Sequence, residues 1–423
     1  MSNSPSIVVV GAGPAGMMAA GQAAQRGARV TLIEKMERPG RKLRITGKGR
    51  CNITNNCPLD EFLRHFGPAG RFLKPSFYNF FAPDLMAFLA SLGVETLTER
   101  GGRVFPAGNQ AQDVVDALTD WIKKMGVVTK TRTGAEKLLL SDLSVRGIRV
   151  SGAACGNRCD LHADAVIIAT GGLSYPLTGS TGDGYRLACD AGHSISPTRP
   201  ALVPLETEGD GARRLQGLSL KNVKASLRVN GKKEANGFGE MLFTHFGVSG
   251  PIILTLSGQA VDACHAGKRV ELSIDLKPAL DDKKLDARLL RDFESHHKMM
   301  IQNILRGLLP PLLIPVCLDM TAIPADRMGS QVTAEERKRL RLWLKDFRLI
   351  VTGHRPIAEA IITAGGIALT EVNAKTLESR LVKGLFFAGE VLDFDADTGG
   401  FNLQAAFSTG YLAGVSAAET RKE

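Results

Sequence analysis

A glycine-rich turn near the start of the chain has the spacing of a nucleotide-binding motif. Gly11, Gly13 and Gly16 follow the β-branched run 7–10 and precede a segment of helix-forming composition, 17–25. In such a turn the first glycine permits a tight bend, the second lets the backbone approach a pyrophosphate, and the third lets the helix pack closely on the strand. The phosphate would meet the helix N-terminus, where free N–H groups and the helix dipole favour negative charge. We therefore predict strand, turn and helix around a pyrophosphate.

A carboxylate at the end of the next predicted strand supports this interpretation. The run 29–33 ends in Glu34, twenty-three residues after Gly11. A carboxylate at that point accepts hydrogen bonds from ribose hydroxyls and repels a 2′-phosphate. An adenine dinucleotide is the predicted ligand, and a glycine turn with a purely structural role is the alternative.

The segment 39–55 favours FAD over NAD as that ligand. It is dense in glycine and in cations, a composition able to wrap a pyrophosphate and a flavin with backbone amides and positive charge. The glycines are Gly40, Gly47 and Gly49, and the cations include Arg41, Lys42, Lys48 and Arg50. The alternative, a solvated basic loop, is weakened because the glycines separate the cations and so predict a chain that bends closely round a ligand.

Two further apolar runs are predicted strands followed by glycine: 164–172 ends in a glycine pair, and 385–393 repeats the pattern with Gly389. In open α/β sheets a bound dinucleotide lies outside the carboxyl ends of the strands. The second run leads into 398–410, where glycines open a predicted helix whose N-terminal amides would face the flavin pyrimidine or a phosphate. The FAD domain is therefore predicted to be split, with its last elements supplied by the end of the chain.

The middle of the chain has a different character. Residues 196–275 alternate apolar and polar in short runs, with Asn230-Gly231 as a hairpin signal, and predict a mostly antiparallel β domain. The spacing over 278–347 is helical, and Thr333 with Glu336 forms a capping-box signature. The predicted domains are 1–195 with 352–423 for FAD binding, 196–277 with 346–351 for the inserted β domain, and 278–345 for a helical subdomain.

Length and apolar patterning limit the classes of protein that remain. A chain of 423 residues is long enough for two or three domains with a buried core. The longest apolar stretches, such as 308–318, contain prolines and fall short of the ~20 residues that cross a bilayer. The N-terminus lacks the basic region and cleavage site of a secretion signal. We therefore expect a cytoplasmic protein that does not enter the membrane.

Cysteine usage and charge argue against several other functions. Seven scattered cysteines without a Cys-x-x-Cys pair indicate reduced thiols and argue against a disulfide framework or a dithiol centre. The formal charge of +10 could attract an acidic partner. Because no uninterrupted Lys/Arg block or basic–aromatic interleaving is present, a solvated basic surface is the preferred interpretation, and no nucleic acid partner is expected.

Two residues are predicted to act in catalysis. His245, in the turn-like stretch 243–251, is one, because a histidine titrates near neutrality and can exchange a proton with a substrate. Tyr175 is the other, because it follows a predicted cofactor-binding strand end and its hydroxyl would reach the flavin or an enone oxygen. The alternatives are a histidine that orders its own loop and a tyrosine that packs beside Pro176.

Other reactive residue types carry weaker signals. Cys51 could be a redox thiol beside the flavin, but without a partner at disulfide spacing a steric contact is favoured. His296, His297 and His354 lack ligand spacing, so no metal site is predicted. The glycines of 179–184 follow no strand, so a second dinucleotide domain is not expected and any NAD(P)H would reach the flavin without a Rossmann domain of its own.

These motifs resemble, over nearly the whole chain, the BaiN/YhiN-type NAD(P)/FAD-dependent oxidoreductases, also called the aminoacetone oxidase family of FAD-binding enzymes. The matching motifs are 11–16, 40–42, 47–55, 102–106, 171–176, 179–184, 242–251 and 399–404. The resemblance implies an α/β fold with a split, Rossmann-like FAD-binding domain, an inserted antiparallel β-barrel-like domain and a small helical domain.

The resemblance also implies non-covalent FAD, held by the glycine loop, by Glu34 and by two later segments. The predicted cofactor-binding residues are Gly11, Gly13, Pro14, Ala15, Gly16, Glu34, Lys35, Gly40, Arg41, Lys42, Thr46, Gly47, Gly49, Arg50, Cys51, Asn52, Thr170, Gly171, Gly389, Glu390, Gly400, Phe401, Asn402 and Leu403.

The sequence thus predicts an FAD-dependent oxidoreductase that passes a hydride between a small organic substrate and the flavin, with NAD(P)H as a transient co-substrate. An amine or amino-ketone oxidase is the first alternative, and a flavin-dependent RNA-modifying or RNA-binding protein is the second. The sequence carries no signal for an oligomeric state.

Overall fold

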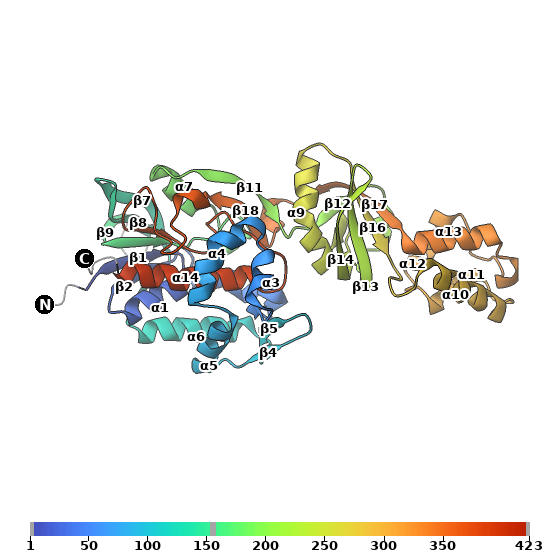
Figure 1. Ribbon diagram of the computed structural model, residues 1–423, viewed down its shortest axis with the longest axis horizontal. Helices are drawn as coiled ribbons and strands as arrows, with labels where there is room; N and C mark the ends of the chain where they lie inside the picture. Colours follow the sequence, from blue (N-terminus) through green and yellow to red (C-terminus); the bar gives the residue numbers. More distant parts are fainter. Residues whose placement is uncertain (1–3, 153–157, 420–423) are drawn as a thin grey trace. The chain divides into compact units, whose positions relative to one another are not determined.

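The computed structural model describes residues 4–152 and 158–419. The chain forms two compact units: one combines Met1–Pro200 with Ala360–Glu423, and the other is Ala201–Glu359. Figure 1 shows the path of the chain through both. The first unit contains all the predicted cofactor-binding residues.

A five-stranded parallel sheet forms the centre of the first unit, in the strand order β19-β10-β1-β2-β6. Its strands are β1 (Ser6–Val10), β2 (Arg29–Ile33), β6 (Val128–Lys130), β10 (Ala165–Ile168) and β19 (Leu385–Phe387). β1 and β10 are short β-branched runs, buried on both faces, as expected for a parallel sheet covered on two sides. The sheet joins strands from both ends of the chain, so this domain is split as predicted.

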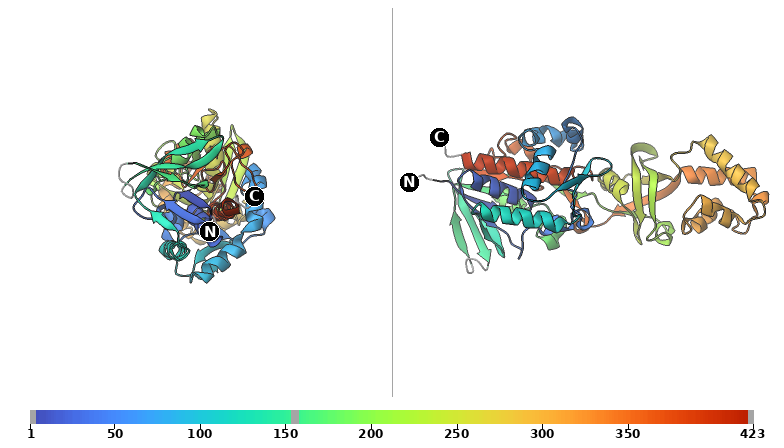
Figure 2. Two further views of the ribbon diagram at one scale, coloured as in Figure 1. Left: turned by 90° about the vertical axis from the view of Figure 1, so that its left-hand side faces the viewer. Right: turned by 90° about the horizontal axis from the view of Figure 1, so that it is seen from below.

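Helices from both ends of the chain cover one face of this sheet. The helices α1 (Pro14–Gln25), α6 (Ala111–Lys124) and α14 (Phe401–Glu419) lie together there (Figure 2). α1 and α14 approach closely: a Cβ added to Gly410 would lie 2.3 Å from the carbonyl oxygen of Ala15, and one added to Gly414 equally close to that of Ala19. Small residues on both helices therefore set the spacing that brings the C-terminal helix to the glycine-rich turn.

The remaining elements of the first unit surround this sheet. The β-elements are β3 (Thr54–Asn55), β4 (Thr96–Thr98) and β5 (Arg103–Pro106) in one small sheet, β7 (Thr133–Ser141), β8 (Ser144–Gly152) and β9 (Cys159–His162) in a second, and β11 (Ile195–Ala201) with β18 (Ile362–Ile367) in a third. The helices are α2 (Arg41–Ile45), α3 (Leu59–Arg64), α4 (Gly70–Asn79), α5 (Ala82–Ser91) and α7 (Asp183–Asp190).

The second unit is built on a closed six-stranded barrel in the order β12-β15-β14-β13-β16-β17. The strands are β12 (Leu205–Thr207), β13 (Ser219–Val229), β14 (Lys232–Phe243), β15 (Gly247–Ser249), β16 (Val270–Asp275) and β17 (Phe347–His354). The predicted hairpin is present: Asn230 and Gly231 both have positive φ, as a tight β-hairpin turn requires. The predicted antiparallel β domain is therefore confirmed and is a closed barrel.

Helices complete the second unit. They are α8 (Gly211–Arg214), α9 (Pro251–His265), α10 (Asp282–Ser295), α11 (Ile301–Ile304), α12 (Leu313–Thr321) and α13 (Ala334–Lys345). The capping box at the start of α13 is formed as predicted, since Thr333 Oγ1 accepts from the Glu336 amide and Glu336 accepts from the Thr333 amide. α9 was not anticipated within the β region; its apolar run is helical because Pro251, at the first helical position, favours a helix start.

Candidate functional site

The glycine-rich turn leaves the N-terminus of α1 open. Gly11 has φ +99°, and a Cβ added to Gly16 would lie 1.8 Å from the carbonyl oxygen of Gly11, so both positions require glycine. A Cβ at Gly13 would instead meet nothing within 4 Å, and no side chain caps α1. The first amides of a helix have no partner inside it. The turn thus presents unsatisfied N–H groups beside open space, which fits the pyrophosphate of FAD.

Glu34 is held beside this turn by two backbone amides. The Ala12 amide donates to Glu34 Oε2 and the Met36 amide to Oε1, each at 2.8 Å. Burial raises the pKa of Glu34, and these two hydrogen bonds together with the charges of Lys35 and Arg41 oppose that rise. An ionised carboxylate has about four lone-pair sites. Glu34 can therefore accept ribose hydroxyls in addition to its two amide donors.

The segment after Gly40 bends sharply, as its glycines predicted. Gly47, Lys48 and Gly49 all have positive φ, and so does Cys51 at +60°. A non-glycine residue with such a backbone is strained, and strain of this kind collects at ligand sites. Beside the bend, Asn52 Oδ1 is buried without a hydrogen-bond partner among the described residues. An orphaned buried acceptor fits a donor on a bound flavin.

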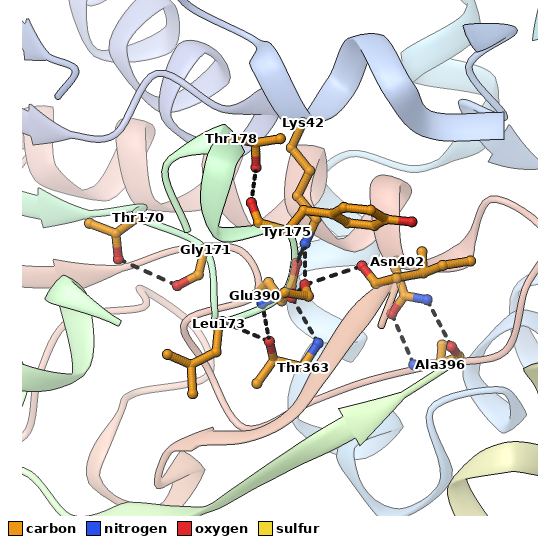
Figure 3. A network of polar contacts seen from close by, with 12 residues as sticks. Lys42, Thr170, Gly171, Leu173, Tyr175, Thr178, Thr363, Glu390, Ala396 and Asn402 are labelled. Atoms are coloured by element: carbon orange, nitrogen blue, oxygen red, sulfur yellow. Dashed lines mark hydrogen bonds and ion pairs between the residues drawn. The ribbon is translucent and has the colours of Figure 1, made fainter. Parts of the chain in front are cut away.

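A polar network joins this segment to two distant parts of the chain (Figure 3). Lys42 Nζ lies 2.6 Å from Glu390 Oε2 and 2.7 Å from Ser174 Oγ. The Thr363 amide donates to Glu390 Oε1 at 2.9 Å, while Thr363 Oγ1 accepts from the Leu173 amide. The positive charge of Lys42 is therefore neutralised by Glu390 and is not a free cation. Ser174 and Thr363 had no distinguishing pattern in the sequence.

Gly400 and Asn402 shape the start of α14. Gly400 has φ +101°, and a Cβ there would lie 2.3 Å from the Thr54 carbonyl oxygen. Asn402 Oδ1 accepts from the Ala396 amide at 2.9 Å, and its Nδ2 donates to the Ala396 carbonyl at 2.8 Å. These contacts fix the loop before the helix, so that the positive end of the α14 dipole faces a defined position.

The other predicted cations are also paired. Lys35 contacts Asp183 at 2.6 Å, and Arg50 binds Glu99 at 2.5 Å and lies over the Phe105 ring. Each of these charges is thus balanced locally, which reduces the positive field that the sequence alone indicated around the phosphates. The roles of all the predicted cofactor-binding residues stay predictions, among them those of Lys35, Arg41, Thr46, Arg50 and Leu403.

The predicted catalytic residues lie in different units. Tyr175 has a left-handed backbone, φ +51°, and its carbonyl accepts from Thr178 Oγ1 at 2.7 Å beside the Lys42–Glu390 network (Figure 3). His245 is an exposed residue of the second unit, between β14 and β15, with its ring edge against Phe246. Both roles stay predictions.

Cys51 does not have the surroundings of a reactive thiol. Its side chain is fully buried, and burial raises its pKa to about 12. The thiolate is the nucleophilic form of cysteine, so this residue is a neutral thiol at physiological pH and the steric interpretation is favoured. No group of three or more metal-ligating side chains exists among residues 4–152 and 158–419.

A pocket of about 510 Å³ opens in the first unit next to the start of α14. His65, Arg103 and Phe401 are among its lining residues. His65 Nδ1 lies 2.8 Å from Asp397 Oδ2, and the imidazole stacks on Phe401 with ring centroids 3.8 Å apart. Sequence reasoning missed His65, because nothing in the pattern links it to Asp397.

The chain is similar to known proteins over nearly its whole length. A family model described as the HI0933-like protein Rossmann domain matches residues 5–416. The 3-dehydro-bile acid delta(4,6)-reductase of Clostridium scindens is 32% identical over 98% of this chain and 99% of its own. The ribosomal RNA dihydrouridine synthase of Escherichia coli is 31% identical over 96% of each chain.

Solved structures share the fold. The alignment with a flavocytochrome c3 fumarate reductase covers 100% of this chain and 79% of the reductase chain, with a TM-score of 0.54 and 19% sequence identity. The alignment with the 3-ketosteroid delta1-dehydrogenase of Sterolibacterium denitrificans covers 99% of this chain and 100% of the dehydrogenase chain, with a TM-score of 0.55 and 14% sequence identity. Together with the family match, these confirm the predicted Rossmann-type FAD-binding fold. Over the described residues, no helix is long and apolar enough to span a membrane.

Proposed function

Because this chain belongs to the HI0933-like family and is an FAD-dependent oxidoreductase, we propose that it reduces a carbon–carbon double bond conjugated to a carbonyl group, with NAD(P)H as the source of electrons. The observation that carries the proposal is the full-length similarity to relatives named a delta(4,6)-reductase and a dihydrouridine synthase. Both names denote saturation of a double bond, and in uridine as in an enone that bond is conjugated to a carbonyl. The names of the two relatives therefore share a type of reaction, although the substrates in those names differ.

Several residues of the first unit support the proposal that FAD binds there. The open amides of α1 would bind the pyrophosphate, and Glu34 would accept the ribose hydroxyls. The N-terminus of α14 would face the flavin pyrimidine, where its dipole favours negative charge. Bound and reduced, FAD supplies a hydride. The chain's own part is to hold the cofactor, orient the substrate and deliver a proton.

An anaerobic titration tests the proposal. The purified holoprotein is mixed with NADH or NADPH, and the flavin absorbance is followed until it bleaches. Addition of 4-androstene-3,17-dione, a conjugated enone, is then expected to restore the oxidised spectrum with formation of a reduced steroid. Bleaching by aminoacetone but by neither nicotinamide would instead favour the amino-ketone oxidase and would contradict the proposal.

The same chemistry on a uridine within RNA is a second candidate. Two relatives named ribosomal RNA dihydrouridine synthase, from Escherichia coli and Haemophilus influenzae, align with 96% and 98% of this chain, and the formal charge is +10. Mass spectrometry of ribosomal RNA incubated with the NADPH-reduced protein would reveal the gain of two hydrogens at a uridine. This experiment also tests the prediction that the protein has no nucleic acid partner.

A further inference from the structure

The pocket beside α14 has walls of mixed character within one unit of the chain. Its lining includes Asn55, Cys57, Glu61, His65, Arg103 and Phe401. A volume of about 510 Å³ lies within the ~300–1,000 Å³ usual for small-molecule sites. Gly399, the second residue before α14, also lines it, so the pocket borders the segment proposed to face the flavin.

The His65 imidazole has a fixed orientation in this pocket. Its Nδ1 is 2.8 Å from Asp397 Oδ2, and its ring lies nearly parallel to Phe401, with 22° between the planes. With Nδ1–H donating to the carboxylate, Nε2 is on the opposite edge of the ring. The side chain is 29% exposed. A nitrogen that can carry a proton is therefore available to a molecule in the pocket.

The positive end of a helix dipole lies beside the pocket and suits an oxygen that becomes negative. The α14 helix has 19 residues and directs the positive end of its dipole toward Gly399 and Phe401. Arg103 adds a cation that is itself paired with Glu99 at 3.7 Å, whereas Asp397 and Glu61 add negative charge, and Asp397 is occupied by His65. Positive groups aimed at developing negative charge stabilise an enolate-like transition state.

We propose that this pocket receives the carbonyl end of an α,β-unsaturated substrate and that His65, oriented by Asp397, delivers the proton that completes the reduction. The inference rests on the proposed function. Bound and reduced, FAD would supply the hydride for a C–H bond at the β-carbon, and the electron pair of the double bond would move toward the carbonyl oxygen. The His65 proton forms the second C–H bond at the α-carbon, and water at the mouth of the pocket then restores the proton.

Three variants test this role. His65→Gln keeps a hydrogen-bond donor for Asp397 but cannot deliver a proton, Asp397→Asn removes the positioning charge, and Arg64→Gln is the matched control on the preceding, exposed position. After anaerobic reduction by NADPH, reoxidation by 4-androstene-3,17-dione is followed by stopped flow. We expect the flavin of His65→Gln to be reoxidised about 100-fold more slowly, which is the lower limit for loss of an acid catalyst. The rate of its reduction by NADPH should be unchanged. Arg64→Gln should keep the wild-type rates of both steps.

The Asp397→Asn variant tests whether Asp397 positions the His65 ring or has only a structural role. Without the carboxylate the His65 ring loses the group that orients it, so we expect slower reoxidation and a changed His65 signal in the spectrum of the ¹⁵N-histidine-labelled protein, with NADPH reduction unchanged. Glu61, Arg103 and Cys57 also face the pocket, and they are unchanged in this variant. A loss of rate without any change in the His65 signal would overturn the positioning role.

A binding measurement by NMR tests whether the steroid enters the pocket, independently of whether it is reduced. With ¹⁵N-labelled histidine, the His65 signal is identified by its absence in His65→Gln, and it is expected to shift when 4-androstene-3,17-dione is added to the oxidised holoprotein. An unshifted signal at saturating steroid, or wild-type reoxidation by His65→Gln, overturns the inference. A shifted signal in a protein that the steroid does not reoxidise keeps the pocket but overturns the proposed function and the proton-donor role with it.

Discussion

The ammonium of Lys42 lies 2.6 Å from a carboxylate oxygen of Glu390, although 348 positions separate the two residues in the chain. Their side chains are only 20% and 17% exposed, and Ser174 bridges them. The pair therefore links the N-terminal and C-terminal portions of the split domain at the site where both are proposed to meet the cofactor.

Removal of one partner of this pair is expected to be costly. Breaking a fully buried pair costs about 3–5 kcal/mol because a charge is left without compensation; at this partial exposure we expect Lys42→Met to lower the free energy of unfolding by about 2 kcal/mol. In a urea titration, the double variant Lys42→Met with Glu390→Gln should lose less free energy of unfolding than the two single variants lose together. The difference, which is the coupling energy of the pair, should be about 0.5–3 kcal/mol. Strict additivity would contradict the interaction.

Gly13 and Gly16 should respond differently to alanine. A Cβ at Gly16 collides with the Gly11 carbonyl, whereas a Cβ at Gly13 has free space and its backbone φ of −80° suits any residue. Gly16→Ala is expected to destabilise the fold. Gly13→Ala is expected to keep the thermal stability of the apoprotein and to weaken FAD binding at least about 10-fold, which is about 1.4 kcal/mol, because the methyl group would occupy the space proposed for the pyrophosphate. Unchanged FAD affinity in Gly13→Ala would place the pyrophosphate elsewhere.

Stability should fall in mild acid because of His193. Its side chain is fully buried, Nδ1 lies 3.1 Å from Glu371 Oε2, and Nε2 lies 2.8 Å from Ser379 Oγ. Burial lowers the pKa of His193 below 6.5, and Glu371 only partly opposes this. As the pH falls below 6.5, the unfolded chain takes up a proton that the folded protein refuses, so stability is lost at a slope of up to about 1.4 kcal/mol per pH unit.

Urea titrations at several pH values between 7.5 and 5.5 measure this loss. His193→Gln removes the titrating group, so its stability is expected to depend less steeply on pH than that of the wild type, even if it is lower throughout. His296→Gln, at an exposed position, is the matched control and should keep the wild-type slope. Equal slopes for wild type and His193→Gln would show that another group carries the acid sensitivity.

The unit Ala201–Glu359 is expected to fold when expressed alone. Its largest hydrophobic cluster is drawn entirely from within these bounds, and its barrel is closed, so it leaves no unpaired barrel edge. Circular dichroism should show one cooperative thermal transition, and the fragment should not retain FAD. A broad, non-cooperative transition would show that this unit depends on the rest of the chain.

Local features of the fold could be predicted from the sequence alone. The strand Arg29–Ile33, the glycine turn, the hairpin at Asn230 and the capping box at Thr333 all depend on residues a few positions apart. Short-range geometry restricts the backbone there, so the pattern and the structure agree. The split of the FAD-binding domain followed for the same reason, since each of its parts carries its own glycine-rich signature.

Contacts across the fold were decided only by the tertiary structure. Nothing in the sequence pairs Lys42 with Glu390, Thr363 with Leu173, or His65 with Asp397, because each pair is separated by more than a hundred residues and no local rule names the partner. The sequence by itself predicted where a dinucleotide would bind and which residue types would surround it. The tertiary structure determined which charges are neutralised and which imidazole is left beside a pocket, because only the folded chain brings those side chains within hydrogen-bond distance.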